Sequence, residues 1–118
     1  MLNKSDLIKY FENGIKNTSE IKIGTEHEKF IYHKSDLSLV PYSGDVSINS
    51  IFEDFIQDGW RPVIENENII ALNKDRASIT LEPGGQFELS GAPLKTIHDT
   101  CKEINNHLAF TKKLEEKY

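Results

Sequence analysis

Four glutamates in two short stretches of the sequence could together bind a divalent cation. Glu26 and Glu28 lie in the first stretch, Ile21 to Tyr32, whose β-branched and aromatic residues predict a strand. Side chains alternate between the faces of a strand, so both carboxylates share one face, about 6.6 Å apart along the backbone. Their repulsion is poorly tolerated in a half-buried sheet unless a cation lies beside them. Oxygen ligands favour Mg²⁺, Mn²⁺ or Ca²⁺ over Zn²⁺, and a solvent-facing pair on an edge strand is the alternative interpretation.

The second stretch, residues 79–93, has the pattern of a strand that is interrupted and then resumes. The interruption is Pro-Gly-Gly at 83–85, where proline cannot donate to a sheet ladder and glycine permits backbone angles that other residues avoid. Glu82 and Glu88 flank it, and a simple turn does not need a carboxylate on each side. This arrangement favours a cation held against the strand. The face taken by Glu82 stays open, because the break is irregular.

Both stretches closely resemble glutamate–cysteine ligase of the type found in plants and many proteobacteria, one of the glutamine-synthetase-like carboxylate–amine ligases. The similar segments are Gly-Thr-Glu-His-Glu-Lys-Phe at 24–30 and Leu-Glu-Pro-Gly-Gly-Gln-Phe-Glu-Leu-Ser-Gly-Ala-Pro-Leu at 81–94. The resemblance extends over nearly the whole chain, including residues 68–72 and 100–107. The complete chain of such an enzyme is several times longer, so residues 1–118 are expected to be the N-terminal, incomplete part of its catalytic domain.

The resemblance implies an ATP-dependent ligation. ATP phosphorylates the γ-carboxylate of glutamate, the amine of cysteine attacks the acyl phosphate, and γ-glutamylcysteine forms as the first step of glutathione biosynthesis. The resemblance also implies that Glu26, Glu28 and Glu88 are catalytic ligands of Mg²⁺ or Mn²⁺. The expected substrate-binding residues are Glu82, Gly84, Gly85 and Gln86. The implied partners are glutamate, cysteine and ATP, together with the remainder of the enzyme, without which the chain is expected to be inactive.

Other interpretations remain open. Gly84 and Gly85 fit an ordinary bulge as well as a close approach of the backbone to a substrate, and Gln86 either hydrogen-bonds the substrate or completes a turn. The acceptor amine is not fixed, so another acyl-phosphate ligase of the superfamily is the first alternative. The second is a non-enzymatic module that binds a divalent cation or a partner subunit, using an exposed sheet edge.

Composition and charge argue against several other functions. Of the 118 residues, 37% are hydrophobic and 28% are charged, which is typical of a globular domain or a piece of one. The net charge of −5 argues against a nucleic-acid partner, which requires a basic surface. No apolar run approaches about 18 residues and no signal-peptide pattern occurs, so no membrane association is expected. Cys101 is the single cysteine and cannot form an internal disulfide, and these features together predict a cytoplasmic protein.

Hydrophobic periodicity predicts an α+β fold in which helices pack on one face of an antiparallel sheet. The resemblance identifies this sheet as part of a glutamine-synthetase-like catalytic domain. The predicted helices span residues 5–16, 48–60 and 96–117. The predicted strands span residues 21–32, 37–42, 61–65, 69–72, 77–82 and 86–90. The first helix is expected to bury Ile8, Phe11 and Ile15, and the last to bury Ile97, Cys101, Ile104 and Leu108.

Several other polar residues are expected to have structural roles. His27 and Lys29 alternate away from the glutamates, to the opposite face of their strand. His98 and Cys101 lie three residues apart on a helix and could share a metal, but two ligands make a weak site and a buried thiol is the favoured interpretation. Solvated positions are expected for Arg61, Lys74 and Arg76.

Overall fold

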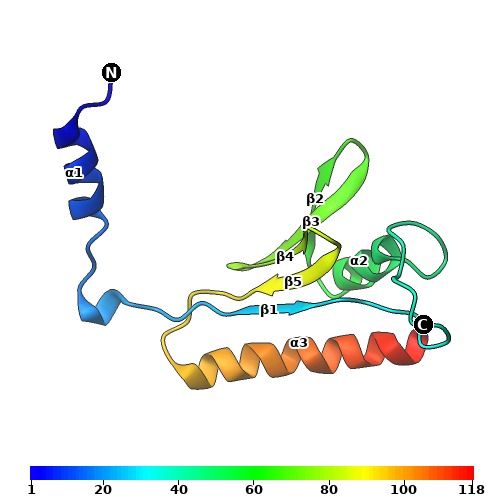
Figure 1. The fold of residues 1–118 in the computed structure, drawn as a ribbon. Coiled ribbons are helices and arrows are strands. Elements are labelled where there is room, and N and C mark those ends of the chain that lie inside the picture. The colour runs from blue at the N-terminus through cyan, green and yellow to red at the C-terminus, as the bar shows by residue number, and fades with distance from the viewer.

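An antiparallel five-stranded sheet, with α2 and α3 on one of its faces, forms the body of the protein (Figure 1). The structure is a computed structural model that describes all 118 residues. Its elements are α1 (Lys4–Asn13), the short 3-10 helix η1 (Thr18–Glu20), β1 (Glu26–Lys29), α2 (Ile48–Gln57), β2 (Arg61–Glu65), β3 (Asn68–Lys74), β4 (Ala77–Glu82), β5 (Gln86–Ser90) and α3 (Ile97–Lys117). The α+β class and the antiparallel sheet are confirmed.

The strand order is β1-β5-β4-β3-β2, so the last four strands form consecutive hairpins and β1 joins the far edge beside β5. The predicted strand over 21–32 is reduced to β1, with single bridges from Ile23 to Leu94 and from Tyr32 to Leu39 on either side of it. The second of these bridges is all that forms of the predicted strand over 37–42, which is wrong. A β-strand of four residues at an edge has few partners, and its position depends on its pairing with β5.

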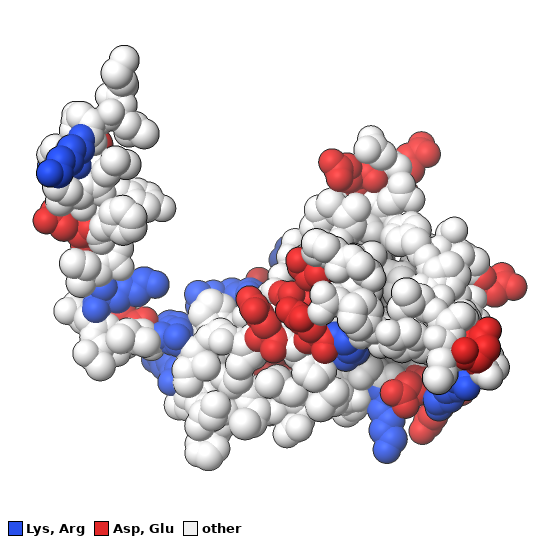
Figure 2. Space-filling view, viewed as in Figure 1, with Lys and Arg blue, Asp and Glu red and all other residues white.

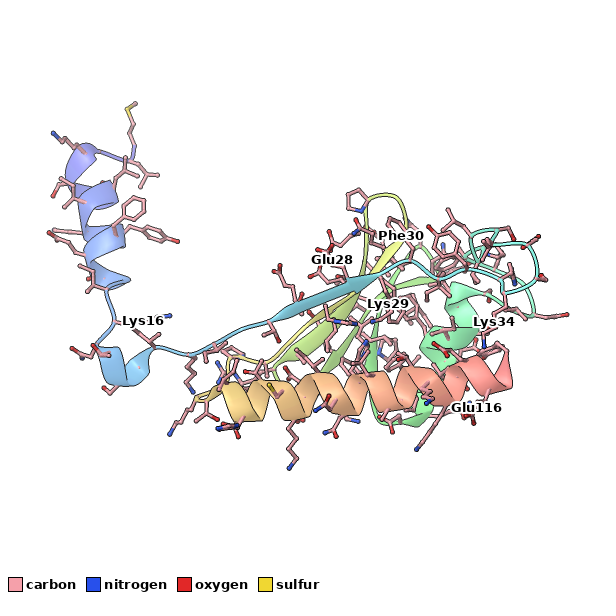
Figure 3. The ribbon with its side chains drawn as sticks, turned by 60° about the horizontal axis from the view of Figure 1, so that its bottom comes forward. Lys16, Glu28, Lys29, Phe30, Lys34 and Glu116 are labelled. Carbon is pink, nitrogen blue, oxygen red and sulfur yellow. The ribbon has the colours of Figure 1, made fainter.

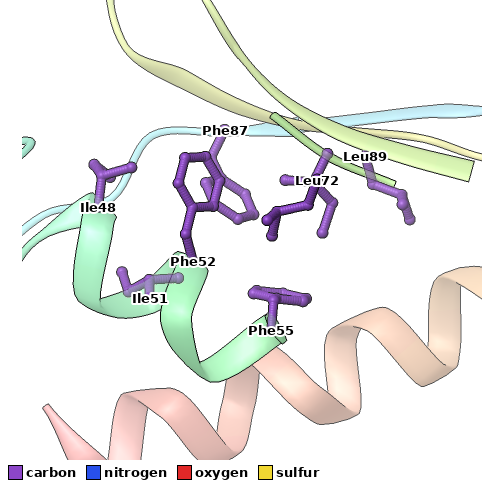
Figure 4. Close-up of a cluster of buried hydrophobic side chains, with 8 residues drawn as sticks. Ile48, Ile51, Phe52, Phe55, Leu72, Phe87 and Leu89 are labelled. Carbon is purple, nitrogen blue, oxygen red and sulfur yellow. The ribbon is translucent and has the colours of Figure 1, made fainter. Parts of the chain in front are cut away.

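The core lies between α2 and the sheet. Leu72, Ile79 and Leu89 stand opposite one another on β3, β4 and β5, so their side chains share the face that α2 covers. The eight buried apolar residues are Ile48, Ile51, Phe52 and Phe55 from α2 and Leu72, Ile79, Phe87 and Leu89 from the sheet (Figure 4). Ser47 caps α2, because its hydroxyl accepts a hydrogen bond from the amide of Ser50.

The long helix α3 is confirmed, but the apolar face expected for it is wrong. Cys101, Ile97 and Leu108 are exposed and only Ile104 of the expected face is half-buried, whereas Thr100 and His107 are buried. Phe110 and Leu114 complete the face that meets the core. The helix is therefore turned from the orientation that its apolar residues suggest, because the sheet presents polar groups to it. None of the helices combines the length and the apolar character that crossing a bilayer requires.

Helix α1 lies apart from this body, at the end of an extended segment (Figure 1). The helix itself is confirmed, and Asn3 caps it through a reciprocal pair of hydrogen bonds with Asp6. None of its residues is buried, so the expected packing of Ile8, Phe11 and Ile15 is wrong within this chain. The radius of gyration is 18.0 Å, against about 13–14 Å for a compact chain of this length.

Candidate metal-binding face of the sheet

The strand register brings the four candidate glutamates to one face of the sheet, away from α2 and α3. Glu28 on β1 stands directly opposite Glu88 on β5, and Glu26 stands opposite Ser90. On the other side of β5, Glu82 of β4 stands opposite Gln86, which alternates onto the same face as Glu88. The open question of where Glu82 lies is thereby answered. Figure 2 shows acidic side chains gathered over β1 and β5.

Glu88 is the most deeply placed of these carboxylates, with only 8% of its surface exposed. Its one hydrogen-bond donor is the hydroxyl of Ser90, 2.6 Å from Oε1. No lysine, arginine or histidine forms an ion pair with any of the four glutamates, because the ion pairs of the protein are Lys74–Asp58 and Lys117–Asp54. A buried carboxylate held only by a neutral donor is costly unless a cation compensates it.

Neutral side chains also hold the neighbouring glutamates. The amide of Gln86 donates to Oε2 of Glu28 at 2.8 Å, and the hydroxyl of Thr80 donates to Oε1 of Glu82 at 3.1 Å. Gln86 thus reaches across from β5 to β1 in addition to ending a turn. Ser90, which donates to Glu88, is the last residue of β5.

The Pro-Gly-Gly segment forms the turn between β4 and β5. Gly84 and Gly85 have φ angles of 82° and 80°, in the left-handed region, and the amide of Gly85 donates to the carbonyl of Glu82 at 2.9 Å. A side chain added at Gly85 would meet no atom within 4 Å, and one at Gly84 would only reach the Phe30 ring. The turn alone therefore explains both glycines, and their contact with a substrate stays a prediction.

The carboxylates on this face are ligands that divalent cations prefer, but they do not by themselves form a complete coordination shell. Directly opposed residues have Cβ atoms about 4.5–5.5 Å apart, so Glu28 and Glu88 can share one ion. No three histidine, cysteine, aspartate or glutamate side chains are already grouped at ligating distance. The residues present therefore fit Mg²⁺ or Mn²⁺, which bind through one or two carboxylates and take other ligands from water and phosphate.

The opposite face of β1 carries a second polar cluster, formed by His27, Lys29 and His107. Glu28 points away from α3 and Lys29 points toward it (Figure 3), as the alternation of the strand predicts. The Nζ atom of Lys29 lies 2.7 Å from Nε2 of His107, and the His27 ring lies edge-on to His107 at 5.8 Å. This cluster fastens β1 to α3.

Burial changes the protonation of this cluster. It lowers the pKa of Lys29 to about 8, because the ammonium is taken out of water. Burial, with Lys29 and then His27 as further causes, lowers the pKa of His107 to about 4, so the ring is neutral at pH 7. The pKa of His27 is also lowered, by burial and by Lys29. The neutral His107 accepts from Lys29 through Nε2, and its Nδ1 is buried without a partner.

The remaining candidates lie elsewhere. Cys101 is exposed on α3, so its expected role as a core thiol is wrong, and with His98 it forms no metal cluster. Lys74 pairs with the carboxylate of Asp58 at 2.9 Å. Sequence reasoning missed His107 and Thr80 as members of the two polar faces. The alternation Ser78-Thr80-Glu82 could have identified Thr80, but nothing local marks His107.

Fold and site together define an α+β protein with a carboxylate-lined sheet face. The family described as Glutamate-cysteine ligase family 2(GCS2) matches residues 22–116. The chain is 47% identical to the chloroplastic glutamate–cysteine ligase of Nicotiana tabacum over 116 residues and 48% identical to that of Medicago truncatula over 117. It is 45% identical to glutamate–cysteine ligase A, chloroplastic, of Oryza sativa subsp. japonica. The chain belongs to glutamate–cysteine ligase family 2.

The comparisons also bear on three expectations from the sequence: how much of the enzyme the chain covers, where it is located and which reaction its family performs. The matches cover 98% of this chain but only 22–23% of each of these three relatives, so the chain spans about a fifth of their length. All three relatives are named as chloroplastic, which contradicts the cytoplasmic location expected above. All three are named as glutamate–cysteine ligases, so a superfamily ligase for another acid or amine is not favoured.

Proposed function

We propose that this chain supplies metal-binding carboxylates to the active site of an ATP-dependent glutamate–cysteine ligase. It does so together with polypeptide of the kind that forms the other four fifths of its relatives. In this reaction the γ-phosphoryl group of ATP passes to the γ-carboxylate of glutamate. The amine of cysteine then attacks the acyl phosphate, loses a proton and forms the amide as phosphate leaves.

The observation that carries the proposal is the uncompensated pair of Glu28 and Glu88. Like charges directly opposite each other destabilise a sheet. A hard cation bound between the two carboxylates, one of which is buried, would offset this repulsion. Membership of a family of glutamate–cysteine ligases supports the proposal that this cation serves the ligation of glutamate to cysteine.

The polar side chains of this face have different proposed roles. Glu28 and Glu88 would hold the ion between β1 and β5, and Glu26, one step along β1, would hold the same or a second ion. Gln86 and Ser90 fix the two central carboxylates through one hydrogen bond each. Glu82, Gly84 and Gly85 sit at the end of the same face and are proposed to meet the substrate. When bound, Mg²⁺ would neutralise charge on the transferring phosphoryl group.

The test uses a full-length protein in which this chain replaces the matching segment of the tobacco ligase. ADP release is measured with glutamate, cysteine and Mg²⁺. We expect Glu28→Gln and Glu88→Gln each to lower kcat at least about 100-fold, a loss typical of removing one group that stabilises the transition state. Glu65→Gln, on the distant strand β2, is the matched control and should leave kcat unchanged.

A direct measurement of the metal accompanies the assay. The electron paramagnetic resonance signal of Mn²⁺ should report one or two bound ions in the full-length protein and weaker binding in the Glu28 and Glu88 variants. If both variants keep their turnover and their Mn²⁺ affinity, the assignment of this face as the metal site is wrong.

A further inference from the structure

Helix α1 has an apolar face that nothing in this chain covers. Leu7, Ile8 and Phe11 lie along one side of the helix, and Ile15 follows in line just beyond its end. Their exposed fractions are 53%, 46%, 73% and 78%. Ser5, Lys9 and Asn13 lie on the opposite, polar side. We call the four apolar residues the α1 face.

A helix of this length does not hold its structure in isolation. It has ten residues, fewer than the roughly 12–15 that even a favourable sequence needs in water. The capping box at Asn3 and Asp6 fixes its start, but no tertiary contact stabilises its far end. The α1 face must therefore be buried against another surface if α1 is to persist.

We propose that the α1 face docks on polypeptide equivalent to the other four fifths of the ligase relatives, against an apolar surface there. The family match begins at residue 22, after α1, but the match to the tobacco relative covers 98% of this chain and so includes α1. The 78% of the tobacco relative that lies outside this match can supply such a surface. The radius of gyration of 18.0 Å leaves α1 far from the body of its own chain. This inference rests on the proposed function for the identity of the partner.

The test compares the hydrogen exchange of α1 amides in the chain alone and in the full-length tobacco chimera. In the chain alone, α1 should exchange as fast as an unstructured peptide. In the chimera, its amides should be protected at least about 100-fold, as in a docked element. The amides of β4 and β5, which pair centrally in the sheet, serve as the internal reference for folding in both samples.

Paired substitutions identify the face. Phe11→Glu should remove the protection of α1 in the chimera, whereas Asn13→Glu, which adds the same charge on the polar side, should keep it. A second measurement does not require the chimera to fold. The tagged chain is co-expressed with the remaining part of the tobacco ligase and should co-purify in equal amounts. Phe11→Glu should weaken that complex at least about 30-fold, as for loss of a buried aromatic anchor.

Three results would overturn the proposal. Protection of α1 in the chain alone, independent of concentration, means that α1 folds onto its own body, where α3 and the sheet leave an open groove of about 690 Å³. Protection that rises with concentration means a dimer of this chain. Equally fast exchange in the chain and the chimera, with no co-purification, means that the α1 face has no partner. Loss of ligase activity with α1 still protected would count against the proposed function and not against the docking.

Discussion

At the scale of single residues, the edge strand β1 carries polar side chains of opposite charge on its two faces. On one face Glu28 and Glu88 are held by neutral donors and lack positive charge. On the other, Lys29 has a histidine partner and no carboxylate. The backbone of β1 thus separates the carboxylates on one face from the half-buried ammonium of Lys29 on the other.

The coupling between Glu28 and Glu88 should change sign with the metal. Without Mg²⁺, Glu28→Gln relieves repulsion and should stabilise the chain by about 0.2–1 kcal/mol, unless Glu88→Gln has already removed it. With Mg²⁺, each substitution should instead reduce the stabilisation that the ion provides. A double-mutant cycle by thermal unfolding, with and without Mg²⁺, measures both couplings. A coupling that is the same in both conditions would show that the two residues share no ion.

Acid should destabilise the body through His107. Its folded pKa of about 4 lies below the value of 6.5 in the unfolded chain, so folding favours the neutral ring. This contribution is complete above pH 6.5 and is lost as the pH falls toward 4, by at most about 3 kcal/mol. Urea unfolding at several pH values should show the loss, and His107→Phe should reduce it. His98→Gln, an exposed change on the same helix, should not.

At the scale of elements, local sequence patterns located the helices, but they did not reliably predict the surface against which each helix packs. The caps and spacing of α2 located its start and its buried face, because Phe52 and Phe55 pack on the sheet that their periodicity requires. The apolar residues of α3 predicted the wrong face, since His107 is buried instead, where it contacts Lys29, 78 positions away, and stacks on Phe55. The amphipathic pattern of α1 indicates that one face needs cover, but no pattern in one chain says what provides it.

The same limit applies to the candidate site. Alternation along β1 put Glu26 and Glu28 on one face, and the resemblance added Glu88. The direct opposition of Glu28 and Glu88 depends on register, which only the folded sheet specifies. The hydrogen bond from Gln86 to Glu28 follows from that register and was not foreseeable.

The turn between β4 and β5 should need glycine at Gly85. Its φ of 80° is unfavourable for other L-residues, so Gly85→Ala should destabilise the protein by about 1 kcal/mol although space is free for the methyl group. Gly24→Ala, where space is also free and φ is ordinary, should be close to neutral. Chemical denaturation of both variants tests the difference, and equal stability would show that the turn tolerates a side chain.

We expect Phe55 to contribute most to the stability with which α2 and α3 pack on the sheet. Its ring lies 4.6 Å from Phe110 of α3 and 5.8 Å from Phe87 of the sheet, so it joins three elements. Phe55→Ala should cost about 3–5 kcal/mol. Ile64→Ala, at an exposed position on β2, should cost far less. Similar unfolding midpoints for the two variants would contradict this view of the core.

At the scale of the whole molecule, the chain has more surface than core. Only 13 of 118 residues are buried, and α1 adds none of them. The sheet is covered on one face, and its acidic face is open. Such a body can position the carboxylates, but it does not form an enclosed site that would keep water away from an acyl phosphate.

The chain alone should therefore show no ligase turnover. ADP release with glutamate, cysteine and Mg²⁺ should stay at background for the purified chain and become measurable when the chain is part of the tobacco chimera. A rate of about 1 s⁻¹ or more for the chain alone, which is an ordinary enzyme rate, would contradict this.

The pairing of β1 with β5 also has a consequence for the order in which the strands are expected to fold. Glu28 pairs with Glu88, 60 positions later in the sequence, whereas β2 to β5 pair with the strands next to them in the chain. Loop closure over that distance is slow compared with forming hairpins. During synthesis β1 leaves the ribosome before the other strands and stays unpaired until β5 has also emerged. We therefore expect the two strands that carry the carboxylates to pair last as the protein folds.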